Sequence, residues 1–167
     1  EAQTTIVLDM FLFNDEVGSS KISHDKLTQN LTEALIVKKR MTPQIEIKVI
    51  TDPINSVYGG IAPEHYRQLR QAGIEVIETD LTALRASNPL WSGFWYLCCQ
   101  GVGNNAEKGW LPNPFGDEKI TLRSYLSLFN FKANHRKTVV VDTLEGWKTL
   151  VTSMNPHDGS SHHSNVA

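Results

Sequence analysis

The sequence is poor in cysteine, and its two cysteines, Cys98 and Cys99, are neighbours. A disulfide between adjacent residues is strained, and metal sites usually take ligands that lie two or more residues apart. We therefore expect both thiols to be reduced and to pack as small apolar side chains. The same shortage excludes a small scaffold held together by several disulfides.

The chain also lacks a strong charge of either sign and any long hydrophobic run. Its 16 Lys and Arg residues against 18 Asp and Glu residues leave a formal net charge of −2. No overall positive field would then attract nucleic acid or anionic lipid, and an anion would have to be held by a local site. No stretch approaches the roughly 20 apolar residues of a membrane-spanning helix, and the N-terminus lacks the pattern of a signal peptide. We expect residues 1–167 to form a single soluble domain.

Strand and helix patterns alternate along the first half of the chain. Apolar or alternating segments predict three strands, at residues 5–13, 45–50 and 74–78. Amphipathic spacing predicts two helices between them, at residues 26–39 and 63–70. The pattern loosens between residues 85 and 115, and the last third returns to predicted strands at residues 129–131, 135–142 and 150–154. This alternation favours an α/β domain whose helices cover a mixed sheet.

The most informative segment is Asn134-His135-Arg136-Lys137-Thr138-Val139-Val140-Val141-Asp142. Its β-branched residues predict a strand, in which side chains alternate between the two faces. His135 and Lys137 then point the same way, about 7 Å apart. This arrangement suits a phosphate, because an imidazole can attack phosphorus while an ammonium group neutralises a non-bridging oxygen. An isolated His-x-Lys pair is more often a solvated strand edge, so the wider pattern decides.

That wider pattern is His-x-Lys, four residues and then Asp142, followed downstream by Thr152-Ser153-Met154-Asn155. The combination resembles the signature of the phospholipase D superfamily. Three flanking segments also look like lipid synthases and phospholipases of that family; they are residues 10–14, 72–76 and 88–91. The resemblance covers most of the chain and implies an α/β/α sandwich, with helices flanking a mixed central sheet.

In that family two such motifs meet at one site, where one histidine forms a phosphohistidine intermediate and the other protonates the leaving alcohol. The resemblance makes His135 the nucleophile or the acid, and Lys137 the clamp on the phosphate. It assigns Ser153 and Asn155, with Thr152 beside them, to hydrogen bonds with the substrate phosphate or to its support. No metal or other cofactor is implied, because histidine and lysine do the work that a cation does elsewhere.

Asp142 is the third catalytic position of the motif, but strand alternation points it away from His135 and favours a structural role that holds the motif. Two positions depart from the family pattern. Thr152 stands where the family usually has glycine, and Ala167 stands where a carboxylate often orients a histidine. Only one motif is present, so we expect the second to come from the missing part of a longer two-motif protein or from a homodimer partner.

The resemblance predicts a cardiolipin synthase-like enzyme that hydrolyses or transfers phospholipid phosphodiesters. The full-length protein could then work at a membrane surface. One alternative is a single-motif phosphodiesterase that acts on nucleic acid as a homodimer, but the net charge of −2 counts against a nucleic-acid partner. Another is a non-catalytic domain of the same fold that binds a phosphate or a partner.

Two further groups of residues have side chains of functional types. His157-Asp158 and His162-His163 include metal-binding residue types, but Asp158-Gly159-Ser160-Ser161 is typical of a turn, so a polar loop is the favoured interpretation. The aromatic cluster of Trp91, Phe94, Trp95 and Tyr96 suits either contact with acyl chains or a helix that packs its rings into the core.

Overall fold

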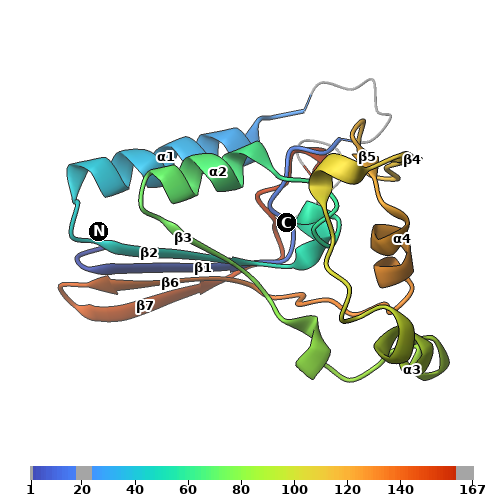
Figure 1. Ribbon diagram of the computed structural model, residues 1–167. Helices are drawn as coiled ribbons and strands as arrows, with labels where there is room; N and C mark the ends of the chain where they lie inside the picture. The colour runs from blue at the N-terminus through green and yellow to red at the C-terminus, as the bar shows by residue number, and fades with distance from the viewer. Residues whose placement is uncertain (1, 18–23, 161–167) are drawn as a thin grey trace.

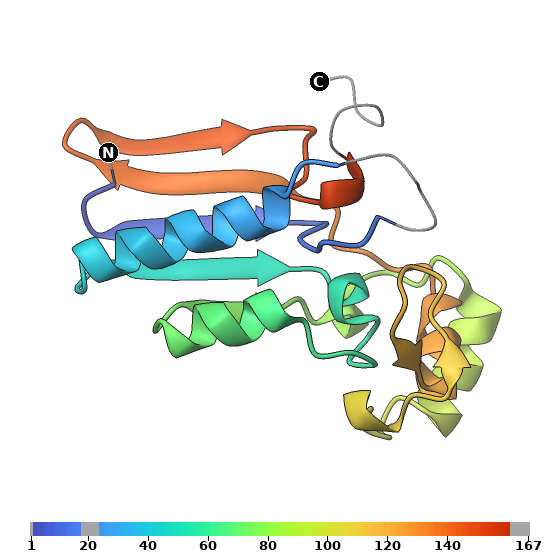
Figure 2. The same cartoon turned by 90° about the horizontal axis from the view of Figure 1, so that it is seen from above.

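Five strands form one mixed sheet in the computed structural model, which describes residues 2–17 and 24–160 (Figure 1). In the order β3-β2-β1-β6-β7, the strands are β3 (Glu75–Glu78), β2 (Glu46–Thr51), β1 (Thr5–Met10), β6 (Lys137–Thr143) and β7 (Gly146–Val151). The first three along the chain are parallel, β6 is antiparallel to β1, and β7 is antiparallel to β6. The carboxyl ends of β1, β2, β3 and β7 therefore lie at the same end of the sheet as the start of β6 (Figure 2).

Helices α1 (Leu27–Met41) and α2 (Glu64–Gln71) both lie on one face of this sheet (Figure 1). Beyond the strand ends lie α3 (Pro89–Cys98), α4 (Leu122–Leu128) and a small sheet of β4 (Leu111–Pro112) and β5 (Lys119–Ile120). The α/β class and the mixed sheet are confirmed. In the described part of the chain, however, helices cover one face rather than the two faces expected of an α/β/α sandwich. The order of the elements explains this difference. After β3 the chain forms α3 and α4 beyond the strand ends, and it then returns to the sheet as the β6–β7 hairpin, so no described helix packs on the second face.

The core lies between the sheet and the two helices that cover it. Alternation along β2 buries Ile47 and Val49, and they pack in one cluster with Leu35 of α1 and Leu69 of α2. Fully burying an aliphatic side chain of this size stabilises the fold by about 1.5–3 kcal/mol. Packing of one sheet face against α1 and α2 therefore holds the strands at fixed positions, and with them the residues at their ends.

The predicted elements of the first half are confirmed within a few residues, but their ends differ. β1 stops at Met10 instead of residue 13, because the amide of Phe13 leaves the sheet and donates to the side chain of Asn55 (2.9 Å). The predicted strand at residues 129–131 is wrong: these residues follow α4, and Phe131 has a positive φ of 49° that no strand allows. β6 begins at Lys137 rather than residue 135, and β7 spans Gly146–Val151 rather than residues 150–154.

The expectation of two reduced thiols is wrong, because the structure joins Cys98 and Cys99 by a disulfide. Two successive helical residues would project their side chains about 100° apart around the axis. Here Cys98 is the last residue of α3, and Cys99 has already left the helix with a φ of −136°. The change of backbone conformation between the two residues is what allows their sulfur atoms to meet.

Replacing Leu69, which is fully buried between α2 and the sheet, tests this description of the core. We expect Leu69→Ala to lower the free energy of unfolding by about 2–5 kcal/mol, measured by urea denaturation, because it removes buried methyl groups and leaves a cavity. Leu90→Ala is the matched control: Leu90 is 90% exposed, and its removal should change stability by less than about 0.5 kcal/mol. Equal losses in the two variants would contradict the assigned core.

Candidate functional site

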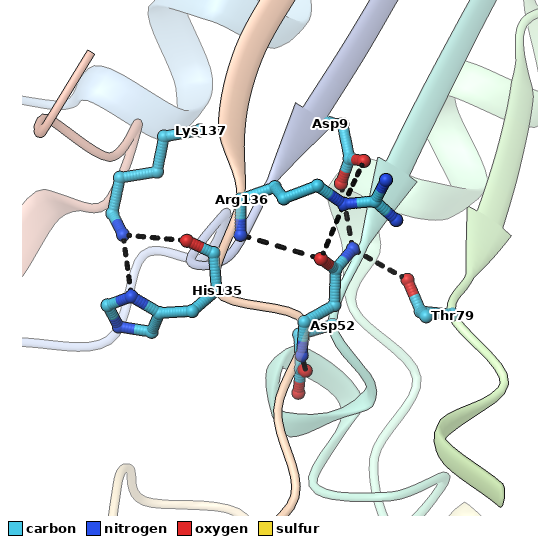
Figure 3. Close-up of polar contacts among 7 residues, drawn as sticks. Asp9, Asp52, Thr79, His135, Arg136 and Lys137 are labelled. Carbon is cyan, nitrogen blue, oxygen red and sulfur yellow. Dashed lines mark hydrogen bonds and ion pairs between the residues drawn. The ribbon is translucent and has the colours of Figure 1, made fainter. Parts of the chain in front are cut away.

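His135 and Lys137 lie together where the chain enters β6. The Nζ atom of Lys137 is 3.2 Å from Nδ1 of His135 and donates to the His135 carbonyl at 3.3 Å. Lys137 pairs with Met10 of β1, so its side chain starts on the face that the helices cover, at the open end of the sheet. The prediction that both side chains point the same way is confirmed (Figure 3).

Phe11 forms the apolar wall of this pair. Its ring centroid is 4.2 Å from that of His135, and the Lys137 ammonium lies 5.3 Å from it. A cation over the face of a ring is attracted by the ring quadrupole. Phe11 therefore restrains both side chains without competing for their polar atoms.

Asn134, directly before His135, is bound through both its backbone and its side chain. Its amide donates to Oδ2 of Asp52 at 2.5 Å, and its Nδ2 donates to Asp9 (2.8 Å) and Thr79 (2.9 Å). Asp52 is fully buried. Burial raises the pKa of its carboxyl, while hydrogen bonds from the Ile54 and Asn134 amides oppose the rise. The three partners of Asn134 come from the ends of β1, β2 and β3, so three strands fix the position of His135.

Arg136 projects to the opposite side from His135 and Lys137 (Figure 3). Its Nε atom lies 3.0 Å from the buried carboxylate of Asp9 and donates to Oδ1 of Asn134 at 2.9 Å. Because side chains alternate along an extended chain, a fixed Arg136 on one side keeps its two neighbours on the other. The ion pair between Arg136 and Asp9 therefore keeps His135 and Lys137 on the opposite side of the chain.

The predicted phosphate-binding residues follow β7 rather than lying on it. Thr152 is held next to the site, since its amide donates to the Lys137 carbonyl at 3.1 Å. Asn155 accepts from the Leu12 amide at 3.1 Å, which places it beside the segment that carries Phe11. Ser153 lies between them and is exposed. The structure therefore brings all three to the end of the sheet that carries His135.

Asp142 lies elsewhere. It is five residues along β6 from Lys137, or about 17 Å at strand rise. Its carboxylate accepts the amides of Gln3, Thr4 and Thr5 and the hydroxyl of Thr4. These bonds, that of the Thr4 hydroxyl foremost, lower the pKa of Asp142 to about 2. Asp142 cannot act on a phosphate at His135; it fastens the N-terminal segment to the sheet.

The remaining candidates have structural partners. Asp158 accepts the Thr28 amide at the start of α1, and Nδ1 of His157 donates to the Asn14 carbonyl. Burial lowers the pKa of His157. Within residues 2–17 and 24–160, no group of three or more His, Cys, Asp or Glu is placed to hold a metal ion. His162 and His163 lie outside the described residues, as does Ala167.

The aromatic cluster lies on a helix, as its packing interpretation requires. Trp95 of α3 is buried, and the Trp91 indole donates to the Leu126 carbonyl of α4. Phe94 and Tyr96 remain exposed. None of the helices in the described part of the chain combines the length and apolar character of a membrane span.

Sequence reasoning missed the residues that support the site, namely Phe11, Asp52, Thr79 and Asn134. The sequence contained a signal for Asp52 and Thr79. Asp52 and Thr79 directly follow β2 and β3, and polar groups after the carboxyl ends of parallel strands are where α/β proteins build their sites. Comparisons with protein-family models, curated proteins and solved structures give no match for this chain.

Replacing Asp142 with Asn tests its structural role through pH. A carboxyl whose pKa falls from 3.8 to about 2 on folding stabilises the fold above pH 3.8, and that contribution is lost as pH falls toward 2. We expect Asp142→Asn to melt below the wild type at pH 7, with a gap that narrows through this window. Glu145→Gln, in an exposed pair with Lys148 on the same hairpin, is the control and should leave the melting curve nearly unchanged. A gap that stays constant from pH 7 to pH 2 would contradict the assignment.

Proposed function

We propose that this chain is a phospholipase D-like domain that cleaves or transfers phospholipid phosphodiesters through a phosphohistidine intermediate, as a cardiolipin synthase-like enzyme does. The observation that carries the proposal is the contact between His135 and Lys137 on one side of the entry to β6. It is the geometry that the His-x-Lys resemblance requires. The net charge of −2 counts against nucleic acid as the substrate.

The pair suits a phosphate because Lys137 supplies a positive charge and hydrogen-bond donors, and His135 supplies a ring nitrogen that can attack phosphorus. An ammonium group only donates, so Nδ1 of His135 accepts from Lys137, and in the neutral ring Nε2 carries the proton. A phosphate oxygen is a stronger acceptor than the ring and would draw the ammonium to itself. Nδ1 is then free to hold the proton, which leaves the lone pair of Nε2 for attack on phosphorus.

The proposed reaction has two balanced steps. In the first, Nε2 of His135 forms a bond to phosphorus as the bond to the leaving alcohol breaks, and that alcohol takes a proton from a second histidine. In the second, water or another alcohol gives its proton to the second histidine, now a base, and displaces His135 from phosphorus. The second histidine comes from another His-x-Lys motif, either further along a longer chain or on a second copy. Lys137 neutralises a phosphate oxygen in both steps.

Phosphate binding tests the clamp directly. We expect Lys137→Met to weaken phosphate or vanadate binding by about 10- to 100-fold at every pH, because it removes a charge-assisted hydrogen bond. His135→Asn should weaken binding less, because the amide that replaces the imidazole can still donate a hydrogen bond. Calorimetric titration, corrected for ligand ionisation, measures both effects. Lys148→Met, from an exposed ion pair on β7, is the control, and a Lys137→Met protein that binds as tightly as this control would overturn the clamp.

Catalysis should depend on assembly, since removing one of two histidines that act as a unit forfeits most of the rate. We expect hydrolysis of bis(p-nitrophenyl) phosphate by this chain alone to be feeble when it is monomeric and to rise per chain with protein concentration. His135→Asn should abolish it. Full turnover by a demonstrably monomeric sample, unchanged by dilution, would show that the site is complete in one chain.

A further inference from the structure

Strand β7 forms one edge of the five-stranded sheet, and in the sheet order of the described chain its one neighbour is β6. Figure 2 shows β7 at the outer border of the sheet, on the side away from α2. All six of its residues are exposed, with Trp147, Leu150 and Val151 at 67%, 59% and 74%. The one charged residue on the strand, Lys148, pairs with Glu145 of the same hairpin. A long and largely apolar edge of this kind readily adds another strand.

The opposite edge of the sheet, β3, is protected against such pairing. It has four residues and carries a carboxylate at each end, Glu75 and Glu78. Arg70 of α2 donates to the Val76 carbonyl at 3.4 Å, so a side chain already occupies one backbone acceptor of this strand. Short length, charge and coverage are the usual ways in which proteins keep edge strands from pairing. The contrast singles out β7 as the edge that can accept a partner strand.

The hydrogen-bond directions along β7 determine which of its backbone groups are available. The Thr152 amide, just after the strand, donates to the Lys137 carbonyl of β6 at 3.1 Å. Backbone groups alternate in direction along an antiparallel strand, so every second residue before Thr152 also bonds to β6. The N–H and C=O groups of Trp147, Thr149 and Val151 therefore point outward, away from the sheet.

The side chains of the same three residues share one face of the sheet. Val139 of β6 packs against the core beneath the helices, and Leu150 is its partner across the hairpin. Because side chains alternate, Trp147, Thr149 and Val151 lie on the opposite face, which no described helix covers. One set of residues thus offers both its backbone groups and its exposed side chains.

Strand β7 is complementary to itself when two copies run antiparallel about a two-fold axis at Thr149. Thr149 then faces Thr149 of the second copy, and Trp147 faces Val151 of the second copy. Each of these opposed pairs joins outward-pointing groups and exchanges two hydrogen bonds. A shift of the register by one residue would oppose outward-pointing groups with inward-pointing ones and lose these bonds. Pairs of β-branched residues, and of an aromatic with a β-branched residue, are favourable across strands.

We infer that β7 joins two copies of this chain into one continuous sheet, with five strands from each copy. A second copy is the occupant that the strand itself specifies, because its outward-pointing backbone groups and its exposed side chains match in the same register. Like charges do not meet, since Lys148 of one copy lies opposite Leu150 of the other. The contact is isologous and uses the unprotected edge of each described sheet, so association closes at two chains.

This pairing is separate from the candidate site. Thr152, which is held next to that site, lies beyond one end of the shared ladder, and Thr152 of the second copy lies beyond the other end. The two sites are then about 20 Å apart along the strands, so this dimer does not bring a second histidine to His135. The inference goes beyond the proposed function, and a contact that completes the site would be a different one.

The experiment is sedimentation equilibrium of the whole chain over a range of concentrations. Because the interface is small, we expect the average mass to rise from one chain toward two with a dissociation constant of about 1–100 μM. Thr149→Pro removes an amide that points outward, which an edge strand tolerates, and should weaken association by about 10-fold or more. Thr149→Lys should do the same, because like charges meet at the axis. Thr149→Val should keep the wild-type association.

Leu97→Lys is the matched control for the loss of exposed apolar surface. Leu97 lies on α3 and is 91% exposed, and its replacement should leave dimerisation unchanged. Cross-linking tests the register. Thr149→Cys should join two copies by a disulfide under mild oxidation, since directly opposed residues have Cα atoms about 5.5 Å apart. Glu145→Cys, about 27 Å from its counterpart, should not.

A single-chain mass at every concentration would overturn the inference. Growth beyond two chains, an equal loss of association in Leu97→Lys, or cross-linking at residue 145 as fast as at residue 149 would overturn it too. Circular dichroism of each variant checks that weaker association is not a loss of fold. Phosphate binding, which tests the proposed function, does not depend on either result.

Discussion

The candidate site depends on one buried carboxylate, that of Asp52. It accepts the amide of Ile54 at 2.9 Å and the amide of Asn134 at 2.5 Å, and it is fully shielded from solvent. A buried acceptor of this kind is costly to leave unpaired, so the chain that enters β6 must pass at this point. The side chain of Asn134 adds bonds to Asp9 and Thr79. The ends of three parallel strands, built early in the sequence, thus position a residue that comes more than 50 positions later.

Because side chains alternate along an extended chain, the fixed position of Asn134 also determines where His135 and Lys137 project. Arg136 is held on one side by Asp9, so His135 and Lys137 project on the other, where the Phe11 ring restrains them. Rigid placement of this kind would serve the proposed phosphate clamp, because a charge that is already aimed at the oxygen costs no reorganisation. The same ring also lines a largely apolar groove together with Leu12 and Ile54.

Local patterns predicted much of this fold, and contacts between distant segments account for what they missed. The amphipathic spacing of α1 and the alternation of β2 are properties of a few neighbouring residues, and both elements were predicted correctly from the sequence. The end of β1 depends on Asn55, some 40 positions away, and the disulfide depends on where α3 stops. Strand parity correctly separated Asp142 from His135. The roles of Asp52 and Asn134 could not be predicted, because each is defined by a partner about 80 residues distant.

The central claim is that His135 and Lys137 form a prepared oxyanion site, and a crystal structure of the chain with bound vanadate tests it most directly. We expect a vanadate whose oxygen lies within hydrogen-bond distance of Lys137 Nζ, with the His135 ring facing the vanadium and Asn134 still bound to Asp52. Vanadate bound only at other positions, with the contact between His135 and Lys137 unchanged, would contradict it.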